Sequence, residues 1–202
     1  MLYLLILVYD KEMDMMYYGI YESFLGNITL VADSDNLMGL WIEGQKYFLR
    51  NVKGDLIRKE DLSVLVQTKA WLDRYFAKER PNIKELPLAP QGSLFQQTIW
   101  NLLCEIPYGT LITYKALAQK AAIMLNKTTM SAQAVGGAVG HNPISIIIPC
   151  HRVVGSNGSL TGYAGGMDKK ISLLELEEVD MSNLFIPKND VYNKKSRGIS
   201  SK

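Results

Sequence analysis

The chain has 202 residues, of which 48% are apolar and 21% are charged, so its composition is that of a globular protein rather than a disordered or fibrous one. The 22 basic and 20 acidic residues give a net charge of +2, which does not by itself predict binding to a polyanion such as nucleic acid. Two cysteines are too few for a disulfide framework and fit a reducing compartment, and two histidines argue against a four-ligand zinc site.

The two ends of the chain differ in composition from the rest. Residues 1–9 are apolar but number about half of the roughly 20 that a membrane helix needs, and they lack the basic leader and cleavage site of an export signal. We interpret residues 1–15 as an extension outside the fold, with an edge strand or a buried N-terminal segment as the alternative. The polar, basic stretch 188–202 is expected to be a disordered tail.

Residues 16–90 have the pattern of a small sheet with one helix. Alternating apolar and polar residues predict three short strands joined by clusters of turn residues into an antiparallel meander, at residues 17–23, 27–33 and 37–43. Apolar residues at helical spacing then predict a helix over residues 62–76 that covers one face of the sheet. Prolines and a glycine between residues 81 and 92 indicate a linker.

Residues 91–187 are predicted to be mostly helical. Ser93 and Gln96 have the spacing of a capping box, and Pro107 follows the helix that they open. Thr113 and Ser131 can cap two further helices joined by a polar turn, a pair that is typical of a helix-turn-helix and also of many ordinary helical packings. The sequence therefore predicts an α/β protein, with a small N-terminal antiparallel sheet and its covering helix followed by a mostly helical domain that contains a helix-turn-helix.

The helix predicted after Ser131 is rich in small residues, namely Ala132, Ala134, Gly136, Gly137, Ala138 and Gly140. A glycine inside a helix costs about 1 kcal/mol relative to alanine, so something must require a close approach to this backbone. Two explanations stay open at this point. One is contact with another polymer, and the other is tight packing against a neighbouring helix.

A cysteine with reactive neighbours follows a buried segment. Residues 144–148 form a β-branched run that predicts a buried strand ending at Pro149. Cys150, His151 and Arg152 come directly after it. A buried, inert thiol is the commoner fate of a cysteine, but the adjacent imidazole supplies a base that can form the reactive thiolate. Cys104, within an apolar helix, is expected to be a core residue.

The cysteine motif resembles that of the methylated-DNA–protein-cysteine methyltransferases, also called O6-alkylguanine-DNA alkyltransferases. The resemblance rests on Pro-Cys-His-Arg-Val-Val at 149–154, preceded by Asn142-Pro143. It extends, in family-like order between residues 93 and 179, to the segments at 106–110, 113–114, 134–136, 162–166 and 173–177. Residues 16–90 look more loosely like the variable first domain of the family.

The resemblance implies DNA repair by direct reversal, in which the alkyl group of O6-alkylguanine, and of O4-alkylthymine, is transferred irreversibly from double-stranded DNA to Cys150. It implies that His151 is the base acting through a water, that Glu177 orients the imidazole, that Asn142 holds the turn, and that Tyr114 contacts the guanine. It implies no cofactor and no metal. An alkylated cysteine is a thioether without a carbonyl for water to attack, so each molecule is expected to react once.

The resemblance also implies which residues contact the DNA and the rotated base, namely Gln133, Ala134, Gly136, Arg152, Val153, Tyr163, Ala164 and Gly165, with Arg152 more a structural cation than a catalytic one. Gln133 stands where well-studied relatives carry an arginine, which fills the space left in the base stack when the damaged nucleotide rotates out of the duplex. Glutamine can occupy that gap but lacks the charge and planar surface of a guanidinium. Between residues 91 and 179, six basic residues against five acidic ones give +1, so we expect few phosphate contacts and a weak salt dependence.

Two other functions stay open. A cysteine hydrolase could use Cys150, His151 and Glu177 for acyl transfer, but it would regenerate its thiol after each turnover. A DNA-binding protein that only flags lesions is the third reading, although alkyltransferase-like relatives of that kind replace the cysteine that this chain keeps. We expect a cytoplasmic monomer that has no obligate protein partner and no contact with membranes.

Overall fold

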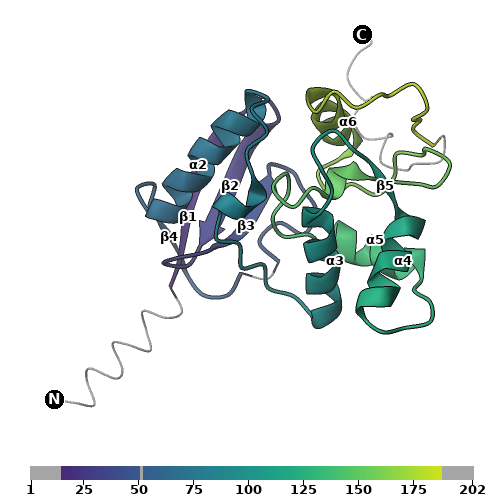
Figure 1. Ribbon diagram of the computed structural model, residues 1–202. Coiled ribbons are helices and arrows are strands. Elements are labelled where there is room, and N and C mark those ends of the chain that lie inside the picture. The colour runs from purple at the N-terminus through teal and green to yellow at the C-terminus, as the bar shows by residue number, and fades with distance from the viewer. Residues whose placement is uncertain (1–14, 51, 188–202) are drawn as a thin grey trace, which may run out of the picture.

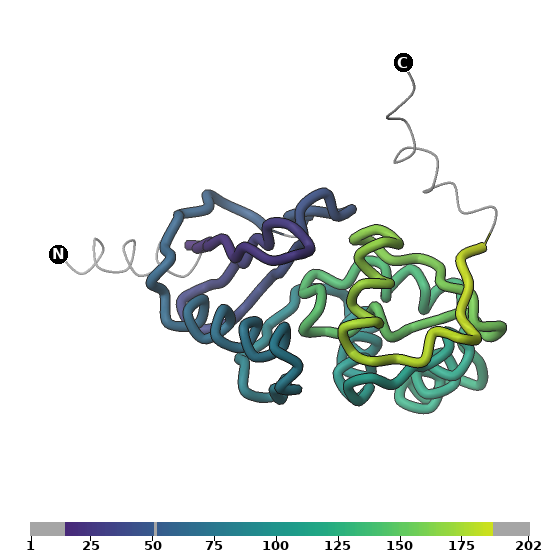
Figure 2. The backbone as a smooth tube through the Cα atoms, turned by 90° about the horizontal axis from the view of Figure 1, so that it is seen from above, coloured from purple at the N-terminus to yellow at the C-terminus, as the bar shows by residue number. Residues whose placement is uncertain are grey.

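The computed structural model describes residues 15–50 and 52–187, so the predicted extension, apart from Met15, and the predicted tail 188–202 lie outside the described residues. Figure 1 shows a sheet with a helix on one side of the molecule and a group of helices on the other, and Figure 2 shows the same two regions side by side from above. Among the described residues, no helix has both the length and the apolar character that crossing a membrane requires.

The N-terminal sheet contains the three predicted strands and one more. Strands β1 (Met16–Ser23), β2 (Gly26–Ala32) and β3 (Leu37–Ile42) pair in antiparallel order, which confirms the predicted meander. Strand β4 (Leu56–Arg58) pairs with β1 in parallel, so the sheet has the order β3-β2-β1-β4 and is mixed rather than purely antiparallel. Strand β4 was not predicted, because three residues are too few for a periodic pattern and their partner strand is distant in the chain.

Helix α2 (Ser63–Phe76) covers one face of this sheet and confirms the predicted helix. Its buried side chains recur at intervals of three and four residues, as in an amphipathic helix: Val64, Leu65, Thr68, Trp71, Leu72 and Tyr75. The helix therefore presents one apolar face to the strands. The hydroxyl of Tyr75 is the polar end of that face, and it lies toward the C-terminal region.

The segment predicted to be a linker is attached to the edge of the sheet. After the short 3-10 helix η1 (Ile83–Glu85), the amide of Leu37 donates to the carbonyl of Pro87 at 2.8 Å, and the amide of Ala89 donates to the carbonyl of Leu37 at 2.9 Å. Farther along the same strand, Leu40 donates to the carbonyl of Pro143 at 2.8 Å. The edge of β3 thus fixes both the connection and a turn of the C-terminal region.

The C-terminal region contains the three predicted helices, α3 (Leu94–Cys104), α4 (Tyr114–Met124) and α5 (Ala132–Gly140). Their predicted N-caps are all present, because the hydroxyl oxygens of Ser93, Thr113 and Ser131 accept hydrogen bonds from backbone amides of the first turn. Each of the three helices packs against the other two. A seven-residue connection, residues 125–131, joins α4 to α5.

Two very short strands place the start of α4 beside the cysteine segment. Strand β5 (Ile112–Thr113) pairs in parallel with β6 (Val153–Val154), directly before Tyr114 of α4. Strand β6 in turn follows the 3-10 helix η2 (Cys150–Arg152). Helix α6 (Met167–Leu176) packs against η2 and closes the region. The pairing of β5 with β6 therefore brings together two segments that are distant in the sequence.

The strand predicted over residues 144–148 is not formed. All five residues are buried, as predicted, but they form a turn in which Ile146 has a φ of 70° and the amide of Ile148 donates to the carbonyl of Ile144 at 3.0 Å. Ile144 makes one isolated bridge with Leu40, after which the chain turns back. The apolar run correctly indicated burial, but burial alone does not distinguish a strand from a buried turn.

One hydrophobic core continues through both regions. The same cluster of buried residues includes Leu30 of the sheet, Leu65 of α2 and Ile99 of α3, together with Val135 of α5 and Ile147 of the buried turn. The sheet and the helical region are therefore packed against each other. This contact allows side chains of the N-terminal region to take part in the site described next.

Candidate active site

Cys150 lies in η2, where the chain leaves the core after Pro149, and it is 5% exposed. Burial raises the pKa of its thiol, while the amide of Asn142 and the charge of Lys170 act in the opposite direction. An unassisted thiol in this position stays protonated at neutral pH. Nucleophilic chemistry at this sulfur therefore needs a base that removes its proton.

Asn142 connects the buried turn to the sulfur. Its Oδ1 accepts a hydrogen bond from the amide of Ile144 at 3.0 Å, and its Nδ2 lies 2.8 Å from the carbonyl oxygen of Ile148. The same Nδ2 lies 3.1 Å from Sγ of Cys150. The side chain thus joins both ends of the turn, and it directs an N–H group at the atom on which a thiolate charge would form.

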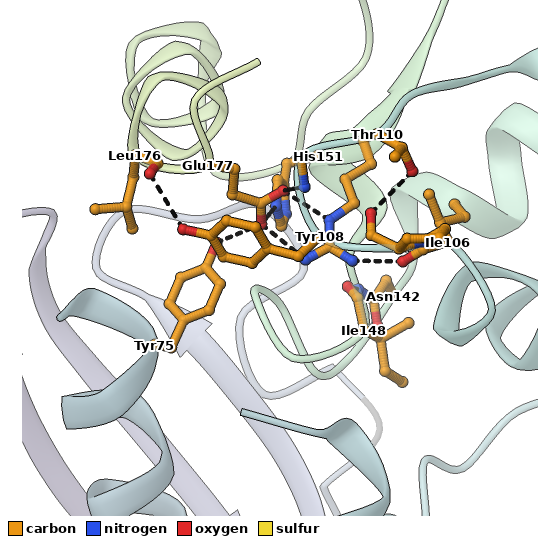
Figure 3. A network of polar contacts seen from close by, with 12 residues as sticks. Tyr75, Ile106, Tyr108, Thr110, Asn142, Ile148, His151, Leu176 and Glu177 are labelled. Carbon is orange, nitrogen blue, oxygen red and sulfur yellow. Dashed lines mark hydrogen bonds and ion pairs between the residues drawn. The ribbon is translucent and has the colours of Figure 1, made fainter. Parts of the chain in front are cut away.

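His151 and Glu177 form a buried pair. Nε2 of His151 lies 2.8 Å from Oε1 of Glu177, and neither side chain is exposed (Figure 3). A carboxylate can only accept, so Nε2 carries the proton of a neutral ring and Nδ1 has the free lone pair. Among the described residues, Nδ1 has no hydrogen-bond partner. The pair therefore sets the tautomer in which the ring can accept a proton at Nδ1.

The protonation of both groups follows from their surroundings. Burial lowers the pKa of His151 despite its bond to Glu177, and the nearby charges of Arg152 and Lys170 act in the same direction as burial. Burial would favour a protonated Glu177, but hydrogen bonds from His151 and Arg152 hold the pKa of this carboxyl well below its usual range. At neutral pH the site therefore contains a neutral imidazole beside an ionised carboxylate.

Glu177 accepts hydrogen bonds from several parts of the chain. Nε and Nη2 of Arg152 each lie 2.8 Å from one of its two oxygens, and the amide of Gly109 donates to Oε2 at 3.1 Å. The hydroxyl of Tyr75, from α2, donates to Oε1 at 2.7 Å. Glu177 is 2% exposed, so these contacts lie in the interior of the protein.

Arg152 belongs to the Glu177 network. Its third nitrogen, Nη1, donates to the carbonyl of Ile106 at 2.6 Å, and its guanidinium lies 5.7 Å from the ring centre of Tyr108. With 5% of its surface exposed, it is a buried cation that compensates a buried carboxylate. A contact between Arg152 and a nucleic-acid base stays a prediction.

Tyr114 lies at the first turn of α4, and its hydroxyl donates to the carbonyl of Thr161 at 3.1 Å. Burial, reinforced by the nearby Cys150, raises the pKa of this hydroxyl to about 12, so it remains protonated at neutral pH. A side chain placed on Gly162, whose φ is +70°, would lie 3.1 Å from this hydroxyl. Glycine therefore permits the loop to approach Tyr114 closely.

A surface cleft lies between α5 and the loop that follows β6. The cleft brings together residues from segments that the sequence analysis had singled out, and it also includes part of the N-terminal region: Lys46, Tyr47, Gly136, Gly137, Gly140, His141, Gly162, Tyr163, Ala164 and Met167. The amide of Lys46 donates to the carbonyl of Ala164 at 3.0 Å, so the N-terminal region supports one wall. Gly165 belongs to the same loop, and Val153, in β6, is buried with its carbonyl bonded to Lys170.

The outer side of α5 resolves one of the alternatives left open by the sequence. A side chain placed on Gly137 or Gly140 would meet nothing within 4 Å, and one placed on Gly136 would come no closer than 3.7 Å to Tyr114. Tight packing within the protein therefore does not require these glycines. Gln133 and Ala134 are exposed in the first turns of the same helix. This surface is open to a partner that approaches the backbone closely.

Two residues near the site were missed by the sequence analysis. Nζ of Lys170, in α6, is fully buried and donates to the carbonyls of Val153 at 2.6 Å and Thr161 at 3.1 Å. Lys170 precedes the buried Leu173 and Leu174 by three and four residues, a spacing that could have placed it on the buried face of α6. Tyr75 follows the buried Trp71 and Leu72 by four and three residues, which places it on the buried face of α2. Nothing in the sequence indicates that its hydroxyl reaches Glu177.

The remaining sequence predictions concern metals and the second cysteine. In residues 15–50 and 52–187, no group of three or more His, Cys, Asp or Glu side chains could hold a metal ion. Cys104 is half-buried and packs against the core, and burial raises the pKa of its thiol to about 11. The charge of Arg152 acts against burial at this thiol, and Cys104 lines a surface pocket together with Arg152 and Tyr75.

Comparisons with known proteins identify the family of the chain. Residues 94–179 match the family model described as the 6-O-methylguanine DNA methyltransferase DNA binding domain, and residues 16–90 match the ribonuclease-like domain of the same proteins. The methylated-DNA–protein-cysteine methyltransferase of Haemophilus influenzae is 39% identical over 83% of this chain and 89% of its own, and that of Methanosarcina barkeri is 43% identical over 81% and 98%. The crystal structure of Mycobacterium tuberculosis OGT in complex with DNA has a TM-score of 0.69, with 36% identity over 80% of this chain and 92% of its own. The chain therefore belongs to the family of the methylated-DNA–protein-cysteine methyltransferases.

Proposed function

We propose that this protein repairs O6-alkylguanine in double-stranded DNA by transferring the alkyl group to Sγ of Cys150. Two contacts on consecutive residues carry this proposal: Asn142 directs an N–H group at the sulfur of Cys150, and Glu177 fixes the tautomer of the imidazole of His151. The names of the relatives support the same activity. O4-alkylthymine is the second lesion that this chemistry would accept.

The transfer begins with loss of the thiol proton. A water between Cys150 and His151 passes that proton to Nδ1, and the ionised Glu177 stabilises the imidazolium that results. The thiolate then attacks the alkyl carbon in line with the C–O6 bond. A carbon–sulfur bond forms as the carbon–oxygen bond breaks, and the electron pair of the broken bond stays on O6 of guanine.

The leaving base must be stabilised as charge develops on it. We assign this role to the hydroxyl of Tyr114, which would donate to N3 of guanine. Because its pKa is about 12, Tyr114 acts as a hydrogen-bond donor and keeps its proton, so the guanine takes its final proton from the imidazolium through water or from solvent. The backbone of residues 163–165 and the carbonyls of Cys150 and Val153 would hold the base in the cleft.

The target atom lies inside a duplex, so the damaged nucleotide must rotate out of the helix at a cost of a few kcal/mol. We propose that α4 and α5 act as a helix-turn-helix, with the glycine-rich outer side of α5 in the minor groove. Gln133 would fill the vacated stack. The open space beside Gly137 and Gly140 supports this placement, because an external backbone could come close to the helix there.

The product explains why each molecule would react once. The alkylated sulfur is a thioether, which water does not cleave, so the protein is consumed and requires no cofactor. We further propose that residues 16–90 form a supporting domain and residues 91–187 the reactive, DNA-binding domain. The protein would act as a cytoplasmic monomer without an obligate protein partner or a membrane contact.

A direct test compares the wild-type protein with Cys150→Ser after incubation with a duplex that contains one O6-methylguanine. Peptide mass analysis should find one added methyl group on the wild-type peptide that carries Cys150 and none on the variant. Cys104→Ser is the matched control and should react like the wild type. If Cys150→Ser removes the methyl group from the duplex, the proposal is wrong.

A further inference from the structure

A side chain of the N-terminal region reaches the residues assigned to thiol activation. The hydroxyl of Tyr75, in α2, donates to Oε1 of Glu177 at 2.7 Å, although the two residues are 102 positions apart in the sequence (Figure 3). Tyr75 is 1% exposed. A buried hydrogen bond to a charged oxygen is among the stronger ones in proteins, so this contact is more than a boundary between two packed surfaces.

Tyr75 and His151 share one oxygen atom. Oε1 of Glu177 accepts from Nε2 of His151 at 2.8 Å, from Nη2 of Arg152 at 2.8 Å and from the hydroxyl of Tyr75 at 2.7 Å. Each additional donor withdraws charge from that oxygen and weakens its attraction for the others. The Tyr75 hydroxyl therefore limits how strongly Glu177 stabilises a protonated His151.

The direction of the hydroxyl is fixed by the packing of its ring. Tyr75 stacks on Trp71 with ring centres 5.5 Å apart, and it meets the edge of Tyr108 at 5.9 Å. Tyr108 is itself held by a bond from its hydroxyl to the carbonyl of Leu176 at 3.1 Å, next to Glu177. Burial and the charge of Glu177 raise the pKa of Tyr75 well above its ordinary value, so the hydroxyl keeps the proton that it donates.

We propose that Tyr75 is a positioning residue for alkyl transfer, which holds the Glu177 carboxylate and limits how strongly that carboxylate stabilises a protonated His151. Thiol activation then depends on the packing of the N-terminal region against the C-terminal region. This inference rests on the proposed function. It gives the N-terminal region a part in the chemistry in addition to its part in the fold. Tyr75 acts through Glu177 and touches neither Cys150 nor the substrate.

The pH dependence of the reaction reports on this role. His151 must be neutral to accept the thiol proton, so protonation of His151 sets the acidic limb of the rate profile. The titratable or charged groups around the His151–Glu177 pair are Arg152, Lys170, Tyr75, Tyr108 and Tyr163, together with Cys150, the preceding residue in the chain. A variant that changes Tyr75 alone leaves the other five groups in place.

The experiment measures single-turnover transfer from an O6-methylguanine duplex between pH 5 and 9 for Tyr75→Phe. Phenylalanine keeps the ring packing and removes one donor from Oε1, so Glu177 holds a protonated His151 more firmly. We expect the acidic limb to move to higher pH and the rate at pH values on that limb to fall about two- to tenfold, the size expected for one lost hydrogen bond. Replacing Tyr75 with 3-fluorotyrosine makes the hydroxyl a stronger donor and should move the limb to lower pH.

The matched control is Tyr21→Phe, which removes another tyrosine–carboxylate bond of the N-terminal region, from the Tyr21 hydroxyl to Oδ1 of Asp73 at 2.8 Å. It should leave the pH profile unchanged. A profile of Tyr75→Phe that superimposes on the wild type, whatever its melting temperature, would overturn the proposal. If Tyr75→Phe does not fold, an unshifted profile of the 3-fluorotyrosine protein would overturn it.

A second readout separates this inference from the proposed function. Alkylation of Cys150 by iodoacetamide needs no DNA, and its pH dependence can be followed by peptide mass analysis with Cys104 as an internal reference. The shift caused by Tyr75→Phe should also appear in this reaction. If alkyl transfer from DNA is absent but the iodoacetamide profile shifts, the proposed function is wrong and the role of Tyr75 is supported. If alkyl transfer occurs but neither profile shifts, the proposed function is supported and the role of Tyr75 is wrong.

Discussion

The strands β1, β2 and β3 are held by backbone ladders, whereas the segments around Cys150 depend on individual side chains. The sheet register repeats over seven consecutive pairs between β1 and β2. The buried turn instead depends on the Asn142 amide, and the loop before α6 depends on the ammonium group of Lys170. Irregular backbone can approach a rotated base from several directions, but single residues must satisfy its polar groups.

The comparison predicts that one substitution near Cys150 costs more than a similar one in the sheet region. Asn142→Ala leaves the amide of Ile144 and the carbonyl of Ile148 without their side-chain partner. We expect the free energy of unfolding to fall by about 2–4 kcal/mol and alkyl transfer to be nearly lost. Urea unfolding and a single-turnover assay measure the two effects.

The matched control is Thr68→Val in α2, where the buried hydroxyl donates to the carbonyl of Val64 at 2.7 Å. That carbonyl belongs to a helical ladder, so this loss should cost no more than about 1 kcal/mol. Equal losses of stability for Asn142→Ala and Thr68→Val would contradict the contrast between the two regions.

A smaller effect is expected from pH. The folded protein keeps His151 neutral below its ordinary pKa of 6.5, whereas the unfolded chain takes up a proton there, so the unfolded state binds more protons as the pH falls. The free energy of unfolding should therefore decrease below about pH 6.5, by at most about 1.4 kcal/mol per pH unit for this one group. Glu177, whose pKa is lowered from 4.5, adds a loss in the same direction at more acidic pH.

Urea unfolding at a series of pH values measures this slope, and His151→Gln assigns it. The variant has no imidazole to protonate, so its stability should change less between pH 7 and pH 5 than that of the wild type. An identical slope in the variant would mean that groups elsewhere in the chain cause the loss.

The smallest effect on stability is expected at the open face of α5. Gln133 is exposed, and Gln133→Ala should change the free energy of unfolding by less than about 0.5 kcal/mol. Under the proposed function, its affinity for a duplex with O6-methylguanine should nevertheless fall several-fold, because alanine could not fill the space that the rotated nucleotide leaves in the base stack. Fluorescence anisotropy in a Cys150→Ser background measures this affinity without reaction.

Gln97→Ala is the matched control for Gln133→Ala, because Gln97 is an exposed glutamine on α3 rather than on α5. It should bind the duplex like the parent protein. If the two variants bind equally well, Gln133 has no part in recognition.

Local patterns predicted most of the regular structure. The alternation before residue 43 indicated β1, β2 and β3, and the hydroxyl residues Ser93, Thr113 and Ser131 marked the starts of α3, α4 and α5. These signals succeed because strand alternation and helix capping are determined by neighbours within a few residues. They fail for β4, β5 and β6, which have two or three residues each and form only by pairing with distant segments.

The site was predicted by residue type and not by geometry. The family resemblance around Cys150 pointed to His151, Asn142 and Glu177, and the structure joins Asn142 to Cys150 and Glu177 to His151. The reach of Tyr75 to Glu177 and the two carbonyl contacts of Lys170 depend on how α2 and α6 pack, which no local pattern encodes. Residues 144–148 are a further example: their apolar character predicted that they are buried, but it did not predict that they form a turn.

The most direct test of the central claim is the number of methyl groups that one protein molecule removes from a large excess of O6-methylguanine duplex. We predict that the reaction stops when one methyl group has been taken up per molecule, with every removed methyl group recovered as a thioether on Cys150. Continued removal beyond one per molecule, with the Cys150 thiol still unmodified, would contradict the account.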